Sequence, residues 1–209
     1  MDEGETLKSD RQQIKPMRTW SALPDASLTS AQSITAAFLK AGVQTYRDAA
    51  SLVYRLPYGR TSSRVDFMAV LIEGRGTCSS KHAVLAELAI EQQLPVALML
   101  GIYLMNKRNT PGIGGVLARQ GLGEIPEAHC YLMYRGARID VTREVESPAE
   151  PIAALLHEEQ ITPPQVGVYK VHLHQEFLRN WLRAGHLRDT WTFDELWRVR
   201  EECIAALET

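Results

Sequence analysis

Apolar residues recur at helical spacing through the N-terminal part of the chain. Between residues 29 and 56 they follow the three- and four-residue spacing of one helix face, and Gly42 stands between two such runs. We therefore predict two helices separated at Gly42. The segment LPYGRTSSR (56–64) breaks the pattern with proline, glycine and small polar residues, which indicates a loop before a short helix at 65–73.

A second helical pattern follows the turn at residues 74–76. It predicts a helix over 78–93 that ends before Pro95, because the residue preceding a proline disfavours the helical conformation. The next segment, PVALMLGIYLM (95–105), is apolar and rich in residues that favour strands. Its length predicts a buried strand, although its periodicity is equally compatible with a buried helix.

Residues 106–126 are rich in glycine and predict a long irregular loop. A flexible surface loop is the favoured interpretation, and a substrate lid is the alternative, since long loops in compact domains often bind ligands. The segment AHCYLMYRGARIDVT (128–142) predicts a β-hairpin that turns near Arg135 and Gly136.

Two further helices are predicted near the C-terminus, over 169–184 and 192–208. Thr192 and Glu195 form a capping-box pattern at the start of the second. Helices first, strands in the middle and helices at the end are typical of an α+β fold.

The chain length of 209 residues suits one sizeable domain. We expect residues 1–26, which are polar, to form a loosely ordered leader. The domain then occupies 27–209, with its core at about 56–145 and a C-terminal helical part at 165–209.

Composition excludes several classes of protein. A net charge of −2 gives no general attraction to nucleic acid or to an anionic membrane. The longest uncharged apolar run has 12 residues, whereas a membrane-spanning helix needs about 20. Cys78, Cys130 and Cys203 are an odd and widely spaced set, which argues against a disulfide scaffold. With no signal-peptide pattern at the N-terminus, we expect a cytoplasmic protein.

Cys78 stands where the turn at 74–76 enters the predicted helix. Unpaired N–H groups and the positive end of the helix dipole favour a thiolate there, which makes a cysteine nucleophilic near neutral pH. The flanking glycines would let a substrate carbonyl approach the backbone, and the Cys78 N–H could donate to an oxyanion. The alternative is a buried small apolar residue, a common fate of a free cysteine.

The predicted hairpin brings a histidine and a carboxylate into reach of each other. With a two- or four-residue loop at the turn, Tyr131 lies opposite Asp140, and Asp140 is then the diagonal neighbour of His129 on the same face. A three-residue loop would put the two on opposite faces unless a bulge intervened. The spacing therefore permits the pair without requiring it.

Three motifs together resemble the transglutaminase-like domains of the papain-like cysteine superfamily, in their bacterial-type branch. They are GTCSSKHAVLAELA (76–89), EAHCYLMY (127–134) and GARIDVT (136–142). In that family a G-x-C motif begins a helix, a strand pair follows, and a histidine precedes an aspartate in a G-x-x-x-D-x-T segment.

The resemblance covers about residues 60–145 and implies a catalytic triad. In it Cys78 is the nucleophile, His129 the general base and acid, and Asp140 the residue that orients the histidine. It also implies a papain-like core, in which the nucleophile-bearing helix packs on a small antiparallel sheet between N- and C-terminal helices. The family usually has an aromatic residue directly after the histidine, whereas here Cys130 follows and Tyr131 comes next.

His82 lies four residues after Cys78, on the same side of the predicted helix. The two could be half of a metal site with His129 and with Asp140 or Cys130, but this ligand spacing has little precedent. A core histidine, or one that supports the nucleophile from beneath, fits the pattern better. We therefore expect no metal and no cofactor.

Three residues are candidates for binding substrate. Tyr58 and Arg60 lie in the loop that leads to the nucleophile, where Tyr58 could donate to an oxyanion and Arg60 could bind a carboxylate. Tyr131 is the aromatic residue nearest to His129 in the second motif.

These observations predict a cysteine-dependent acyl-transfer enzyme that attacks an amide or peptide bond and forms a thioester on Cys78. Hydrolysis is favoured over cross-linking because no calcium-type acidic cluster is present. The substrate would be a peptide, a protein or an amide-containing small molecule, with no nucleic acid or membrane partner. The alternatives are a catalytically silent transglutaminase-like module that binds peptides and a metal-dependent hydrolase. Substrate identity and oligomeric state stay open.

Overall fold

The computed structural model describes residues 20–143, 154–185 and 189–208. It has an α+β fold, as predicted, built around a four-stranded antiparallel sheet in the order β3-β2-β1-β4. The strands are β1 (Ala97–Asn106), β2 (Glu124–Tyr134), β3 (Ala137–Ile139) and β4 (His157–Ile161).

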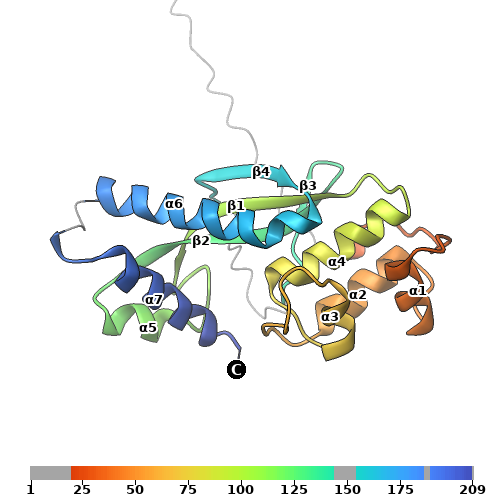
Figure 1. The fold of residues 1–209 in the computed structure, drawn as a ribbon, viewed down its shortest axis with the longest axis horizontal. Coiled ribbons are helices and arrows are strands. Elements are labelled where there is room, and N and C mark those ends of the chain that lie inside the picture. Colours follow the sequence, from red (N-terminus) through yellow and green to blue (C-terminus); the bar gives the residue numbers. More distant parts are fainter. Residues whose placement is uncertain (1–19, 144–153, 186–188, 209) are drawn as a thin grey trace, which may run out of the picture.

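The helices form two groups around this sheet (Figure 1). Helices α1 to α4 lie together on one side, with α4 in contact with each of the other three, whereas α5 and α7 lie together on the other. Helix α6 runs in front of the sheet between the two groups. The helices are α1 (Ser33–Lys40), α2 (Tyr46–Arg55), α3 (Met68–Glu73), α4 (Cys78–Glu91), α5 (Gly114–Arg119), α6 (Val168–Ala184) and α7 (Phe193–Ala205), with 3-10 turns η1 (Trp20–Ala22) and η2 (Pro163–Val166).

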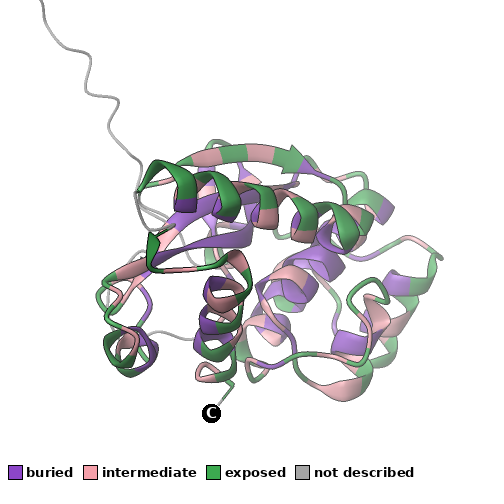
Figure 2. Cartoon of the chain, turned by 60° about the vertical axis from the view of Figure 1, so that its left-hand side comes forward, coloured by how far each residue is buried: buried purple, intermediate pink, exposed green. Residues whose placement is uncertain are grey.

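Helix α4 occupies the centre of the molecule. It contacts β1 and β2, and 11 of its 14 residues are buried. Figure 2 shows the contrast with α6, whose outward turns are exposed. Cys78, the residue at which the sequence predicts reactivity, is therefore the first residue of a largely buried helix.

Local sequence signals locate several element boundaries. Gly42 separates α1 from α2, and its φ of +81° lies in the left-handed region that glycine adopts at little cost. The turn between β2 and β3 consists of Arg135 and Gly136, both with positive φ, as a two-residue hairpin loop requires. Tyr134 therefore pairs with Ala137, which is the register that brings His129 and Asp140 to the same face.

Residues 106–126 are not the irregular loop that their glycines predict. They contain α5, and β2 already begins at Glu124. Ile113 is fully buried and Leu117 nearly so, so the segment is anchored by two apolar side chains of the core. It is therefore part of the folded body and not a detached lid.

Strand β4 has no counterpart in the sequence prediction. Its sequence, HEEQI, alternates exposed and half-buried polar residues, a composition that disfavours strands. It forms because β1 offers its free edge, with Leu98 opposite Ile161 and Ile102 opposite His157.

The folded region begins earlier than the predicted boundary at residue 27. Trp20–Ala22 forms η1, Leu23 is fully buried, and the Ala26 carbonyl accepts a hydrogen bond from Tyr46 N–H. The rest of the predicted leader lies outside the described residues. In the part of the chain that the structure describes, no helix is both long and apolar enough to cross a membrane.

Candidate active site

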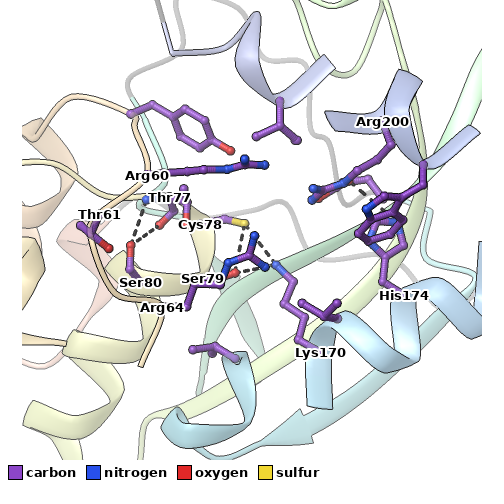
Figure 3. A pocket seen from close by; sticks show the side chains of 16 residues that line it. Arg60, Thr61, Arg64, Thr77, Cys78, Ser79, Ser80, Lys170, His174 and Arg200 are labelled. Atoms are coloured by element: carbon purple, nitrogen blue, oxygen red, sulfur yellow. Dashed lines mark hydrogen bonds and ion pairs between the residues drawn. The ribbon is translucent and has the colours of Figure 1, made fainter. Parts of the chain in front are cut away.

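Cys78 is the first residue of α4 and is 7% exposed. The turn before it is closed by Ser80, whose hydroxyl accepts a hydrogen bond from Thr77 N–H at 3.0 Å. The Cys78 sulfur faces a pocket between the start of α4, the loop after α2, and helices α6 and α7 (Figure 3). The predicted placement of a cysteine at a helix N-terminus is thus what the structure has.

Gly76 is required by close packing. A Cβ at this position would lie 2.8 Å from Lys81 Cγ and 2.9 Å from Ser80 Oγ. Its backbone also pairs with the loop after α2, donating from its N–H to the Pro57 carbonyl and accepting from Gly59 N–H. Gly76 therefore holds that loop beside Cys78 by backbone hydrogen bonds. The sequence had suggested a different role, in which the glycine lets a substrate carbonyl approach the backbone.

His129 and Asp140 form a tight pair. His129 Nε2 lies 2.7 Å from Asp140 Oδ2, and Thr142 N–H donates to Asp140 Oδ1 at 2.7 Å. Burial on its own would raise the pKa of Asp140, but the charge and hydrogen bond of His129 outweigh it and hold this pKa well below its usual range. Asp140 is therefore a carboxylate that accepts a hydrogen bond from His129 Nε2–H.

Because Asp140 occupies Nε2 of His129, Nδ1 is the ring nitrogen that remains for Cys78, and the charge and hydrogen bonding of His129 act on the Cys78 thiol. Burial would raise the pKa of Cys78, but the charges of Lys170 and then of His129 lower it to about 6. Burial would lower the pKa of His129, yet Asp140 and Cys78 raise it to about 10. At neutral pH the two groups accordingly form a thiolate–imidazolium pair.

Lys170 on α6 is a second cation at the sulfur, and sequence reasoning missed it. Its ammonium lies 3.6 Å from Cys78 Sγ and donates to Ser79 Oγ at 2.6 Å (Figure 3). The side chain is buried, and the neighbouring thiols and Glu127 raise its pKa despite the opposing effect of burial. A lysine in an amphipathic helix 92 residues away carries no signal that would have found it.

His82 lies one turn after Cys78 on α4 and is a neutral histidine. Its Nε2 accepts a hydrogen bond from Val141 N–H at 2.8 Å, so its Nδ1 carries the proton and donates to the Cys78 carbonyl at 2.7 Å. Burial is the main reason that its pKa falls to about 4. The ring thus ties the first turn of α4 to the residue that follows Asp140.

The far wall of the pocket holds a buried ion pair that the sequence did not indicate. Arg200 of α7 donates to both oxygens of Glu127, on β2, at 2.7 and 2.6 Å. Its guanidinium carbon also lies over the Trp197 ring, 5.4 Å from the ring centroid. Next to it, His174 of α6 hydrogen-bonds the Pro126 carbonyl through Nε2 at 2.9 Å. Together these contacts fix α6 and α7 against β2.

Of the three predicted substrate-binding residues, two line the pocket. Tyr58 is half-buried there, and its pKa is raised well above its ordinary value by burial and by the charge of Cys78. Arg60 lines the pocket too, but its guanidinium is paired with Glu201 at 2.5 Å. Its charge is therefore already matched within the protein.

Tyr131 does not line the pocket, and the prediction for it is wrong. Its side chain is fully buried, and its hydroxyl donates to Glu158 on β4. Its ring also packs near Gly101, whose missing side chain leaves room for it. The hydroxyl thus links β2 to β4 by a side-chain hydrogen bond.

The other histidines and cysteines among the described residues are candidate ligands for a metal ion. Within residues 20–143, 154–185 and 189–208, no three His, Cys, Asp or Glu side chains group as metal ligands would. Both nitrogens of His82 are engaged in hydrogen bonds. Burial raises the pKa values of Cys130 and Cys203 to about 11, which makes them unreactive beside Cys78.

Comparisons with protein-family models, curated proteins and solved structures find no match to this chain.

Proposed function

We propose that this protein is a cysteine-dependent acyl-transfer enzyme with a transglutaminase-like domain of the papain-like superfamily. The observation that carries the proposal is the position of His129, which hydrogen-bonds Asp140 through Nε2 and acts on the Cys78 thiol by charge and hydrogen bonding. A thiolate, a base beside it and a carboxylate that orients the base are the three parts that nucleophilic catalysis by cysteine needs.

The first half of the proposed reaction forms a thioester. The Cys78 thiolate attacks the carbonyl carbon of an amide, and the Cys78 N–H at the start of α4 donates to the resulting oxyanion. As the intermediate collapses, the C–N bond breaks and the amine leaves with the proton that His129 Nδ1 held. The Nε2 proton stays on the hydrogen bond to Asp140 throughout.

The second half releases the acyl group. Water attacks the thioester carbonyl while His129 takes one of its protons, and the C–S bond then breaks to restore the thiolate. The product is a carboxylic acid, and a second amine in place of water would give transamidation by the same steps. Hydrolysis is the simpler outcome because it needs only water at the mouth of the pocket.

Two observations weigh against the alternatives. A catalytically silent peptide-binding module would have no need to keep His129 in contact with a Cys78 that faces a pocket. A metal-dependent hydrolase would need free histidine nitrogens near Cys78, but those of His82 and the Nε2 of His129 are occupied by Val141, Cys78 and Asp140.

Site-resolved alkylation tests the activated nucleophile. At pH 6 we expect iodoacetamide to modify Cys78 about a hundredfold faster than an ordinary thiol, because roughly half of it is thiolate at a pKa near 6. Mass spectrometry reads each cysteine separately, so Cys130 and Cys203 act as internal controls that stay unmodified in the folded protein. A rate at Cys78 no faster than that of N-acetylcysteine amide would contradict the proposal.

A peptide library tests acyl transfer itself. The wild type should hydrolyse a subset of amides, and hydroxylamine should intercept the thioester as a hydroxamate, whereas Cys78→Ala does neither while keeping its circular dichroism spectrum. Rapid alkylation without any turnover across peptide and small-amide substrates would favour the binding module instead.

A further inference from the structure

The pocket around Cys78 is lined by more positive than negative side chains. Arg60, Arg64, Lys170 and Arg200 are its cationic residues, and Glu127 is the carboxylate among the lining residues that the structure describes. Such an excess of one charge in a partly enclosed site attracts ligands of the opposite charge.

Two of the four cations are already matched within the protein. Arg200 holds both oxygens of Glu127 and also donates to Glu201 at 2.6 Å. Arg60 pairs with Glu201 at 2.5 Å and lies 3.9 Å from Glu208. These contacts shape the pocket and leave little positive charge for a ligand.

Arg64 is different. It lies on the exposed loop before α3, and none of the acidic side chains in the described residues pairs with it. In Figure 3 its side chain extends toward Cys78 and Lys170. It therefore offers an unmatched guanidinium at the mouth of the pocket, and guanidinium groups bind carboxylates through two parallel hydrogen bonds.

Lys170 has two negative neighbours, the Cys78 thiolate at 3.6 Å and Glu127. The two oxygens of Glu127 already accept hydrogen bonds from Arg200. Acylation converts the sulfur into an uncharged thioester, and Lys170 then keeps the Ser79 hydroxyl as its hydrogen-bond partner. The loss of a negative neighbour makes a buried ammonium less favourable. The acyl-enzyme would be stabilised if the substrate itself brought a negative charge to this place.

We propose that the acyl substrate carries a carboxylate within a few bonds of the attacked carbonyl, received by Arg64 at the mouth of the pocket and by Lys170 at its base. The inference rests on the proposed function, since it takes Cys78 as the reactive group. It narrows the substrate class to acidic peptides or small amide acids, which share this chemistry.

A matched pair of reagents tests the inference without knowledge of the substrate. Iodoacetate and iodoacetamide react with thiolates by the same displacement, and the first adds a carboxylate. With a simple thiolate, iodoacetate is disfavoured by charge repulsion. On Cys78 we expect the iodoacetate-to-iodoacetamide rate ratio to exceed that of N-acetylcysteine amide by about tenfold, at the low end of electrostatic steering.

Variants assign the effect to Arg64. Arg64→Gln should lower the ratio about threefold, in line with a solvent-exposed charge, and Arg64→Lys should retain most of it. Arg108→Gln removes an equal charge from an exposed residue that does not line the pocket, and it should leave the ratio unchanged. Equal losses in Arg64→Gln and Arg108→Gln would overturn the assignment.

The outcomes separate the inference from the proposed function. Fast iodoacetamide alkylation with no relative preference for iodoacetate overturns the inference and leaves the enzyme proposal standing. Slow reaction with both reagents overturns both. To identify the source of the carboxylate, succinamate and a glutamate-containing peptide are compared as protectants of Cys78. Equal protection by succinamide and by the glutamine version of the peptide would count against an anionic substrate.

Discussion

The Cys78 sulfur lies between two cations that differ in nearly every other respect. On one side His129 of β2 hydrogen-bonds the thiolate and is oriented by Asp140. On the other side Lys170 of α6 lies 3.6 Å away and is oriented by Ser79. Both favour the thiolate, but in the proposed reaction His129 exchanges its proton with the substrate while Lys170 keeps its own.

The two sides also differ in how they are built. His129 belongs to a buried network in which Asp140 accepts from Thr142 N–H and His82 accepts from Val141 N–H. Lys170 reaches the site from a separate helix, and its side chain hydrogen-bonds Cys78 and Ser79 in the first turn of α4. In the proposed reaction, His129, which is held in a hydrogen-bonded network, transfers the proton. Lys170, which comes from a separate helix, contributes a positive charge that does not change.

Removal of His129 should have the largest effect. His129→Gln deletes both a positive charge and a hydrogen bond to the sulfur, so the pKa of Cys78 should rise from about 6 toward the ordinary value. Alkylation by iodoacetamide at pH 6 should then fall about a hundredfold, and turnover should be lost. The rate is measured from pH 4 to pH 10, with Cys78→Ala as the blank.

The sign of the pH dependence follows from these groups. In the wild type, alkylation should rise as the pH passes through about 6, because the thiolate form is the one that reacts. In His129→Gln the same rise should occur at higher pH. An unchanged midpoint in the variant would mean that His129 does not bear on the thiolate at all.

Removal of Lys170 should have a smaller effect on the same measurement. Lys170→Met keeps the length and burial of the side chain but deletes its charge, so alkylation at pH 6 should fall about tenfold. Lys170→Arg retains the charge and should recover most of the rate. If the midpoint of Lys170→Met stayed near pH 6, Lys170 would contribute only to packing. The claim that its charge stabilises the Cys78 thiolate would then be wrong.

Replacement of His82 should change the thiolate least, because this histidine is neutral in the folded protein. In His82→Leu we expect the alkylation midpoint to stay near pH 6. Stability to urea at pH 7 should nevertheless fall by about 2 kcal/mol, since Val141 N–H and the Cys78 carbonyl lose their shared partner.

His82 also gives the stability of the wild type a defined pH dependence. Its pKa is lowered from 6.5 to about 4 in the folded protein, so the unfolded chain binds a proton first as the pH falls. The contribution of His82 is complete above pH 6.5 and decreases by about 2 kcal/mol from pH 7 to pH 5. His82→Leu should lack this decrease, whereas His172→Gln, at an exposed histidine of α6, should keep it.

Much of the site depends on residues that are close in sequence, and these parts could be predicted. The turn residues Arg135 and Gly136 set the hairpin register, which places His129 and Asp140, 11 positions apart, within hydrogen-bond distance. The start of α4 at Cys78 follows from the turn before it. The division of the first helical region at Gly42 is of the same local kind.

Other parts had no local signal. Strand β4 is polar and forms only because β1 has an edge to pair with. Helix α5 lies in a glycine-rich segment whose order comes from burying Ile113 and Leu117. Tyr131 follows His129 by two positions and yet bonds Glu158 on β4, which the sequence could not foresee without that strand.

The sequence by itself determined the position of Cys78 at a helix start, and it limited the His129–Asp140 pair to a few possible loop lengths, because turn geometry and strand alternation act over a few residues. Only the tertiary structure decided what else surrounds the sulfur. Lys170 and Cys78 are 92 positions apart in the sequence, and Arg200 and Glu127 are 73 positions apart, yet each pair is in contact. These long-range contacts depend on how α6 and α7 pack against the rest of the fold, and no short stretch of sequence carries that information.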